Sequence, residues 1–251
     1  MKIAAVIAVH ERYDITLKTI LRLKNQSPEL KHIIIIGSSE SEKTLAYLTG
    51  SIFISSANKP LGKKWQKGIY VAKDLNCDGV MILGSDDWIT DNWIRTCVNK
   101  ANEGYELIGK REFHFLKISK NGVKLGLWKG YPVNDLRHME PIGAGRIFMR
   151  TLLDRLQWKI FPDYLDSGLD KASYFLAIAH NAKIDLLDNT HNYILDIKST
   201  FWKNKWSFEQ LVDSNNTQNL HDPYSFLDKY FPDAREWINN LINLHIKNDK
   251  K

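Results

Sequence analysis

The sequence is short of cysteine and has no long hydrophobic run, and both shortages limit what the protein can be. Its 251 residues include two cysteines, Cys77 and Cys97, which stand in neither metal-ligand nor redox spacing. This favours a reduced intracellular setting over a disulfide scaffold. The apolar run at residues 3–9 is far shorter than the roughly 20 residues of a membrane-spanning helix, and no small-residue cleavage site follows it. We therefore expect a cytoplasmic protein without a membrane span.

Internal repeats and low-complexity segments are also absent from the sequence. What is present is a net charge of +6 and a sequence pI of about 9.1. An excess of positive charge favours an anionic ligand, nucleic acid or a membrane surface, but it identifies none of them.

The first hundred residues alternate between apolar runs and amphipathic stretches. Strands are expected at residues 2–9, 32–39, 51–56 and 79–83, and helices at 10–26, 41–48, 65–75 and 91–101. Residues 58–64 are expected as a loop, and Glu42 is placed to form a capping box with Ser39. Alternating strands and helices indicate βαβ units, and hence an α/β fold with a mainly parallel sheet covered by helices.

The pattern changes after about residue 105. Residues 105–118 and 122–128 are expected as strands joined by a hairpin at "SKNG", and a long irregular loop follows at 130–145. A helix is expected within 165–182 and a short strand at 183–187. Amphipathic helix, interrupted at "HDPYS" and "YFPDA", follows from about residue 206. The domain prediction is one α/β domain over 1–200 and a helical C-terminal extension over 201–251.

Two adjacent carboxylates follow a buried strand in "GVMILGSDDW". Ligands of open α/β sheets bind beyond the carboxyl ends of the strands, where Asp86 and Asp87 are expected. One of them could cap the next helix, although Thr90 and Asp91 lie nearer its start. Paired carboxylates in such a place need a cation, and a hard divalent ion with a phosphorylated ligand would supply one.

Three segments in this order resemble the GT-A glycosyltransferases, in particular the inverting enzymes of family two. They are the first strand with its polar end, "VIAVHERYD", the segment "NKPLGKKWQKGIYVA", and the strand with its acidic end, "MILGSDD". The resemblance covers roughly residues 2–188. It implies a GT-A (Rossmann-like) fold whose residues 1–104 bind a nucleotide sugar, with residues 105–200 on the acceptor side.

The resemblance gives the carboxylates separate roles. Asp87 matches the last carboxylate of the family motif, which holds Mn²⁺ or Mg²⁺ on the sugar diphosphate. Asp86 matches the one before it, which faces the ribose or the metal shell. The first acidic position is Gly84 or Ser85 here, so the acid is missing.

The resemblance also implies a UDP-sugar as the donor and contacts to it from four further segments. An Asp that reads the base often follows the second strand of the family, but this chain has "GSSE", so Ser38 or Ser39 would contact the base instead. The implied contacts are His10, Arg12, Ser38, Asn58, Gly62, Lys63, Asp86 and Lys198. His10 has a structural role as an equal alternative, and Arg12 could pair with a local acid instead of phosphate.

The catalytic carboxylate is expected at the start of the helix in "FPDYLDSGLDKASYFLAIAHNAKI". Alignment with the end of the family's helix places Asp170 at this position, with Asp166 one turn earlier as the second candidate. Both could instead be first-turn acids that the helix dipole favours. His191, in the segment "DNTHNYILDIKS", corresponds to a further metal ligand in some relatives, although a lone His is more often structural.

The implied reaction is a single displacement in which an acceptor hydroxyl attacks a sugar's anomeric carbon while a carboxylate removes the proton. The acceptor is open: a saccharide, a protein or a nucleic acid. Aromatic residues alternate with Lys198, Lys203 and Lys205 in "DIKSTFWKNKWSF", which would suit a modified base in DNA or a sugar, but burial of the tail is the commoner reason. A nucleotidyltransferase is disfavoured because "HERYD" has no glycine, and a degenerate binding module remains a second alternative.

Overall fold

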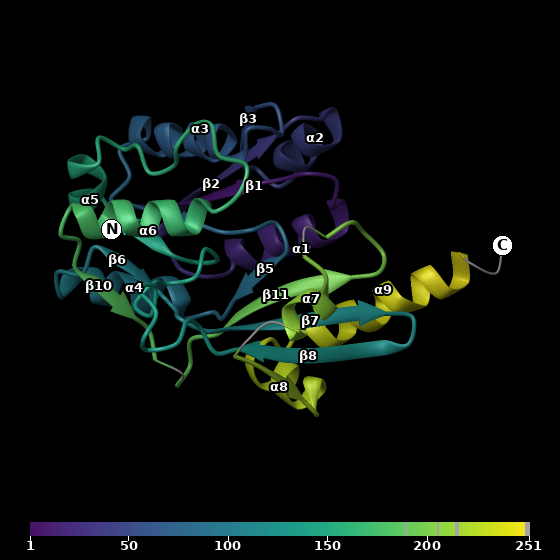
Figure 1. The fold of residues 1–251 in the computed structure, drawn as a ribbon. Helices are drawn as coiled ribbons and strands as arrows, with labels where there is room; N and C mark the ends of the chain where they lie inside the picture. The colour runs from purple at the N-terminus through teal and green to yellow at the C-terminus, as the bar shows by residue number, and fades with distance from the viewer. Residues whose placement is uncertain (189, 205, 214–215, 249–251) are drawn as a thin grey trace.

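The computed structural model describes residues 1–188, 190–204, 206–213 and 216–248. Within this part of the chain, seven strands form a first sheet in the order β10-β6-β9-β4-β1-β2-β3 (Figure 1). Their bounds are β1 Ile3–Ala8, β2 Leu30–Gly37, β3 Ile52–Ser55, β4 Gly79–Ile82, β6 Leu107–Gly109, β9 Ile147–Met149 and β10 Ile184–Leu186. All neighbours pair in parallel except β9, which runs antiparallel to β4 and β6. The expected mainly parallel α/β sheet is confirmed.

Helices bury both faces of this sheet. On one face lie α1 (Tyr13–Lys24), α2 (Glu40–Leu48) and α4 (Trp93–Asn102), and on the other α3 (Leu61–Asp74), α5 (Arg150–Arg155) and α6 (Leu169–Ala179). Strand β1 is apolar throughout because both of its faces are buried. Ile3, Ala5 and Ile7 enter one core cluster, while Ala4 and Val6 enter the other.

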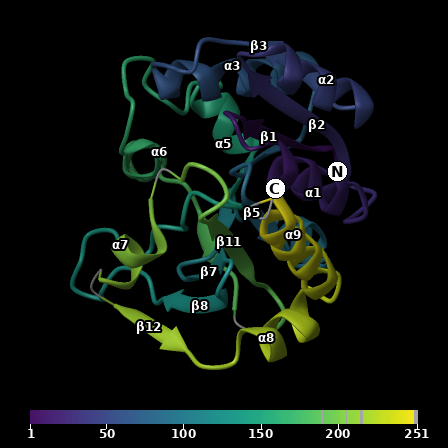
Figure 2. The same cartoon turned by 90° about the vertical axis from the view of Figure 1, so that its right-hand side faces the viewer.

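A second sheet continues beside the first, in the order β12-β8-β7-β11-β5. Its strands are β5 (Asp87–Ile89), β7 (Phe113–Ser119), β8 (Gly122–Trp128), β11 (Ile194–Ser199) and β12 (Thr217–Leu220). The hairpin expected at "SKNG" is confirmed, because β7 and β8 pair antiparallel down to Ser119 and Gly122. Figure 2 shows this sheet below the first, with β11 next to β5 and β12 at its outer edge.

The C-terminal segment packs against this second sheet. It contains α7 (Phe208–Val212), α8 (Pro223–Tyr230) and α9 (Ala234–Asn248) as well as β12. Phe231 and Ile238 lie in one buried cluster with Trp88 of β5 and Leu116 of β7. The expected helical extension is therefore helical for the most part, but it also adds an edge strand and completes a core.

Several local expectations were wrong. Residues 105–118 form two strands in different sheets, because the chain crosses from the first sheet to the second at residues 110–112. Helix α3 begins at Leu61, inside the expected loop. Strands β5, β11 and β12 were not expected at all. The capping box at the start of α2 is confirmed, with Ser39 accepting from the Glu42 N–H and Glu42 from the Ser39 N–H.

Candidate active site

Three carboxylates from two parts of the chain meet where β4 ends. Asp86 and Asp87 follow β4 through a tight turn, and the chain then continues as β5. Strand β11 pairs antiparallel with β5, so that Asp196 lies directly opposite Asp87. Ligand oxygens of Asp86, Asp87 and Asp196 all lie within 4.8 Å of one another. The sequence prediction located two of these groups and missed the third.

Two cations lie against the carboxylates. The guanidinium of Arg12, which precedes α1, forms an ion pair with the Asp86 carboxylate. Lys198, two residues after Asp196 on β11, lies with its Nζ 3.3 Å from Asp86 Oδ2 and 2.6 Å from Asp196 Oδ1. Three negative and two positive side chains thus leave one uncompensated negative charge when all are ionised.

Burial and mutual repulsion separate the acidities of the three carboxyl groups. Burial raises the pKa of Asp87 well above its usual range, and the neighbouring Asp196 and Asp86 raise it further. Burial likewise raises the pKa of Asp196, to about 6. The pKa of Asp86 is instead lowered, because Lys198 and Arg12 outweigh the effect of burial. At Lys198, the attraction of the Asp196 and Asp86 carboxylates outweighs the effect of burial and raises the pKa of the ammonium group.

The donor set fits a hard divalent cation. Carboxylate oxygens are the ligands that Mn²⁺ and Mg²⁺ prefer. Although Lys198 is near, Asp196 Oδ1 is buried and has no partner in hydrogen-bonding geometry among the described residues. A raised pKa at both Asp87 and Asp196 is the expected sign of surplus negative charge that such an ion would balance.

Gly84 is one of the two positions, with Ser85, at which the first acid of the motif would stand. A Cβ atom at Gly84 would lie 2.4 Å from Asp87 Oδ2, which folds back to accept the Gly84 N–H at 2.8 Å. A side chain at this position would require the Asp87 carboxylate to move. The carboxylate of Asp87 therefore occupies space that a side chain at position 84 would need.

The two lysines that follow Asn58 and Gly62 lie in different surroundings. Lys63 is exposed on α3, whereas Lys64 is buried and donates to Val9 O and, at 3.0 Å, to Asn58 Oδ1. Burial lowers the pKa of Lys64 to about 8. The N–H of Gly62 donates to Leu165 O at 2.7 Å, and a Cβ at Gly62 would lie 2.0 Å from Pro162 O. Gly62 thus lets α3 approach the loop before α6.

His10 and Ser38 are both exposed at the ends of β1 and β2. The His10 ring lies beside Glu11, whose Oε2 is 3.8 Å from Nε2. The backbone N–H of Ser38 donates to Glu42 Oε2 at 2.6 Å. These two side chains are therefore open to solvent near the site but are not part of its charged cluster.

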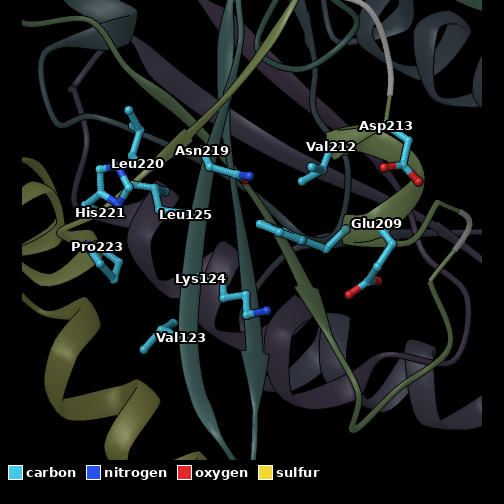
Figure 3. Close-up of a pocket in the computed structure, with 11 residues that line it drawn as sticks. Val123, Lys124, Leu125, Glu209, Val212, Asp213, Asn219, Leu220, His221 and Pro223 are labelled. Atoms are coloured by element: carbon cyan, nitrogen blue, oxygen red, sulfur yellow. The ribbon is translucent and has the colours of Figure 1, made fainter.

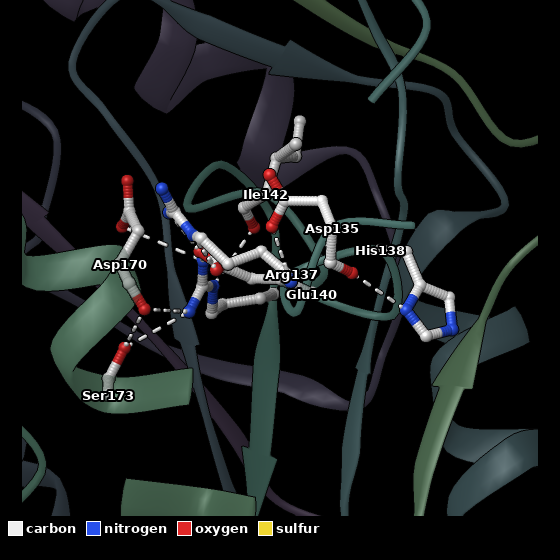
Figure 4. Close-up of polar contacts among 8 residues, drawn as sticks. Asp135, Arg137, His138, Glu140, Ile142, Asp170 and Ser173 are labelled. Carbon is white, nitrogen blue, oxygen red and sulfur yellow. Dashed lines mark hydrogen bonds and ion pairs between the residues drawn. The ribbon is translucent and has the colours of Figure 1, made fainter. Parts of the chain in front are cut away.

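Asp170 lies in the first turn of α6, where its half-exposed carboxylate faces a buried arginine (Figure 4). The guanidinium of Arg146 is 3.7 Å from Asp170 Oδ1 and donates to the Asp170 carbonyl oxygen and to Ser173 Oγ. Glu140, which is also buried, lies between Arg146 and Arg137 and pairs with both. Asp170 thus belongs to a network in which the second carboxylate, that of Glu140, is already paired with two arginines.

Asp170 and the three carboxylates are linked through one segment of backbone. The Ile82 N–H donates to Arg146 O, and the Gly145 N–H donates to Ile82 O, so this segment runs beside the end of β4. A Cβ at Gly143 would lie 2.4 Å from Asp170 Oδ1, so the start of α6 rests on the same segment. Asp166 is placed differently: its carboxylate accepts the Leu61 N–H at 2.9 Å and satisfies the start of α3.

His191 lies on an exposed turn before β11 and is not in the carboxylate cluster. It precedes Asp196 by five positions, and β11 begins only at Ile194. The sequence did contain a signal for Asp196. In "YILDIKS" apolar and polar residues alternate, which is typical of a half-buried strand with Asp196 and Lys198 on one face.

A cavity of about 410 Å³ opens at the far edge of the second sheet (Figure 3). It is lined by Val123, Lys124 and Leu125 of β8, by Phe208, Glu209, Val212 and Asp213, and by Asn219, Leu220, His221 and Pro223. None of the predicted site residues lines it. The carboxylates lie toward the opposite edge of this sheet, at β5 and β11, so this cavity is not the place of the charged cluster.

The aromatic and basic residues after β11 differ in their exposure. Phe201 stacks on His245 of α9 with ring centroids 4.0 Å apart, while Trp206 is half exposed. Lys203 is exposed, and Lys205 lies outside the described residues. Among the described residues, no helix has both the length and the apolar character needed to cross a membrane.

Comparisons with known proteins agree with this geometry. The family described as Glycosyl transferase family 2 matches residues 4–156, more than half of the chain. None of the curated proteins compared with the chain matches it.

Solved structures with a similar fold include residues 1–349 of TarS from S. aureus, with a TM-score of 0.55 and 14% identity over 78% of this chain and 60% of that one. For TarS 1–349 in complex with UDP-GlcNAc the TM-score is 0.54 and the identity is 17%, over 98% of this chain and 66% of that one. A third similar structure is the mannosyltransferase PcManGT from Pyrobaculum calidifontis in complex with GDP-Man and Mn²⁺. Its TM-score is 0.54 and its identity is 8%, over 78% of this chain and 56% of that one. At these identities the likeness shows the fold, and this chain spans about 60% of the length of the TarS fragment.

Proposed function

Since the chain belongs to glycosyl transferase family 2, we propose that it transfers a sugar from a nucleoside diphosphate to an acceptor hydroxyl with inversion. The observation that carries this proposal is the cluster of Asp86, Asp87 and Asp196 with Arg12 and Lys198 at the end of β4. A cluster of this kind can bind a diphosphate through cations and hold a divalent ion through oxygens.

In the proposed site, Asp87 and Asp196 hold the ion, and Asp86 stays ionised between its two cationic partners. Mn²⁺ or Mg²⁺ bound there would neutralise the charge that the leaving diphosphate gains. Arg12 and Lys198 would contact the phosphate oxygens and add fixed positive charge in a site that excludes water. His191 was the ligand expected from the sequence, and in the proposed site Asp196 takes its place.

Asp170 is the proposed base. An acceptor hydroxyl is a weak nucleophile at neutral pH, so a carboxylate must remove its proton as the new bond to the anomeric carbon forms. The Asp170 carboxylate is half exposed, so an acceptor can reach it. The buried guanidinium of Arg146 lies beside this carboxylate and holds it in position. Asp166 stays the second candidate, although its carboxylate already accepts the Leu61 N–H. The PcManGT and TarS complexes with GDP-Man and UDP-GlcNAc support a nucleotide sugar as donor.

Calorimetry of UDP binding, with Mn²⁺ and with a chelator, tests the metal site. We expect tight binding only with Mn²⁺ and loss of that dependence in Asp87→Ala and Asp196→Ala, because both remove an oxygen ligand. His191→Ala should have a smaller effect than either. Asp74→Ala, which removes an exposed carboxylate at the end of α3, is the matched control and should bind as the unmodified protein does. Equal UDP affinity with and without chelator would contradict the metal site.

A further inference from the structure

Asp86 and Asp87 lie on one tight turn after β4, and neighbouring elements hold the backbone of this turn. The Asp86 carbonyl oxygen accepts the Ile197 N–H of β11 at 2.9 Å. The carbonyl oxygen of Ser85, one residue earlier, accepts instead from a side chain, because the hydroxyl of Thr19 donates to it at 3.1 Å. Thr19 belongs to α1, so a helix far away in the sequence supplies one of the hydrogen bonds of the turn.

The hydroxyl of Thr19 also reaches the other end of the turn. Its oxygen accepts the indole N–H of Trp88 at 3.1 Å while it donates its own proton to the Ser85 carbonyl oxygen. Ser85 directly precedes the two carboxylates and Trp88 directly follows them. Thr19 is buried, so this one hydroxyl joins both ends of the turn away from water. A hydroxyl can do this because it is a donor and an acceptor at once.

Helix α1 contacts the charged cluster at two further places. Arg12, the residue before the helix, forms an ion pair with Asp86. The guanidinium of Arg22, three residues after Thr19, lies over the Trp88 ring, with Cζ 5.0 Å from the ring centroid. Metal ligands must be held within about 0.5 Å of their productive geometry by the groups around them. A turn fixed from behind by a helix meets this requirement.

We propose that Thr19 is a positioning residue for the divalent ion, because its hydroxyl fixes the turn that sets the Asp87 carboxylate opposite Asp196. Thr19 does not contact the ion itself, since its hydroxyl is bonded to Ser85 and Trp88 behind the turn. The inference rests on the proposed function, because it takes the carboxylates as an ion site. A group that only stabilised the fold would change the stability of the protein and leave the ion affinity of the folded protein as it is.

The test compares Mn²⁺ binding by the unmodified protein and by Thr19→Val. Valine has nearly the shape of threonine, so the packing of α1 is kept while both hydrogen bonds of the hydroxyl are lost. Electron paramagnetic resonance follows free Mn²⁺ as the ion is titrated into the protein, with and without UDP. We expect Thr19→Val to bind Mn²⁺ about 10–100-fold more weakly, the usual effect of removing a group that orients metal ligands. Circular dichroism fixes a temperature at which every variant is folded.

Thr16→Val is the matched control. Thr16 lies three residues earlier on α1 and is also buried, but its hydroxyl has no hydrogen-bond partner among the described residues. The same substitution there removes the same atom from the same helix without breaking either bond to the turn. Mn²⁺ affinity should therefore be unchanged in Thr16→Val, and thermal stability should not fall, because a buried hydroxyl without a partner is unfavourable.

Thr19→Ser and Thr19→Ala keep the inference testable if Thr19→Val does not fold. Both variants lose the methyl group of threonine, and they differ from each other by the hydroxyl alone. Thr19→Ser keeps the bonds to Ser85 and Trp88 and should retain most of the Mn²⁺ affinity. Thr19→Ala should lose affinity by about the same factor of 10–100 as Thr19→Val.

Equal Mn²⁺ affinity in Thr19→Ser and Thr19→Ala overturns the role of Thr19 and leaves the proposed function intact. The same conclusion follows if Thr19→Val melts at a lower temperature than Thr16→Val but binds Mn²⁺ equally well, because the hydroxyl would then serve the fold alone. Failure of the unmodified protein to bind Mn²⁺, alone and with UDP, overturns the metal site of the proposed function and this inference with it.

Discussion

At the scale of single residues, Asp170 and Asp166 differ in what they can do. Both are exposed acids near the start of α6, but Asp170 faces Arg146 beside the end of β4 while Asp166 accepts the Leu61 N–H. Asp170→Asn keeps the size of the side chain and removes its basicity. We expect transfer to fall by ~10²–10⁴-fold, the usual contribution of a general base. Donor affinity should hold, because the proposed donor contacts lie on other elements.

Asp166→Asn is the control for this change. Asparagine accepts an N–H at the start of a helix about as well as aspartate, so stability and turnover should both be retained. Turnover and donor affinity measured on the two variants decide between them. An inactive Asp166→Asn beside an active Asp170→Asn would move the base by one turn. Normal turnover in both would remove the catalytic carboxylate from this helix.

Asp86 and Asp87 could be located from the sequence, whereas Asp196 could not. The difference lies in how far the position of each residue depends on pairing between strands. Asp86 and Asp87 follow a strongly apolar strand, so their place at a sheet edge could be predicted from order alone. Asp196 joins them only because β11 pairs with β5 in one particular register. Register between strands a hundred residues apart depends on tertiary packing, which a single sequence does not specify.

The different exposure of Lys63 and Lys64 depends on where helix α3 begins. Adjacent residues on a helix point in directions about 100° apart, so an error of one residue moves a side chain from the core to the solvent. The structure begins α3 at Leu61, four residues before the expected start at residue 65. With the start corrected, Lys64 faces Val9 and Asn58, and Lys63 faces water.

At the scale of elements, long apolar strands and amphipathic helices were predictable, and the short strands were not. Strand β5 has three residues and begins with Asp87, directly after Asp86, so its composition suggests a turn. It is a strand because Trp88 packs behind it against Trp237 of α9, with ring centroids 5.2 Å apart, and because β11 pairs beside it. The C-terminal helix thus supports from behind the strand that carries Asp87 on its front.

Helix α9 should accordingly contribute to the stability of the whole fold. Ile238 is fully buried among Trp88, Leu116 and Phe231, so Ile238→Ala is expected to lower the free energy of unfolding by about 2–5 kcal/mol. Leu244→Ala, at a half-exposed position of the same helix, should change it by less than about 0.5 kcal/mol. Urea unfolding followed by tryptophan fluorescence measures both. Equal changes in the free energy of unfolding for the two variants would mean that α9 is not packed as described.

At the scale of the whole molecule, two buried groups should make stability depend on pH with opposite signs. Burial, aided by the charge of Lys110, lowers the pKa of His114 to about 4, whereas a histidine in the unfolded chain has a pKa near 6.5. The unfolded state therefore binds more protons between these values, and stability falls as pH decreases from about 6.5 to 4. Burial raises the pKa of Asp196 to about 6, so this group favours the folded state as pH falls through the same window.

His114→Phe separates the two contributions. The ring of His114 stacks on Phe226 with centroids 4.2 Å apart, and its Nδ1 has no hydrogen-bond partner among the described residues, so phenylalanine should pack in its place. The pKa shift corresponds to at most about 3 kcal/mol. Measured without divalent ions, the variant should therefore gain up to that much stability relative to the unmodified protein between pH 6.5 and pH 4.

Urea unfolding at several pH values gives this difference directly, because the contribution of Asp196 is common to both proteins and cancels. His180→Phe, at an exposed position after α6, is the control and should follow the unmodified protein at every pH. Parallel curves for His114→Phe and the unmodified protein would show that His114 titrates equally in the folded and unfolded states. Its ring would then be reached by water, and the packing of α8 on β7 would be looser than the stacked contact with Phe226 implies.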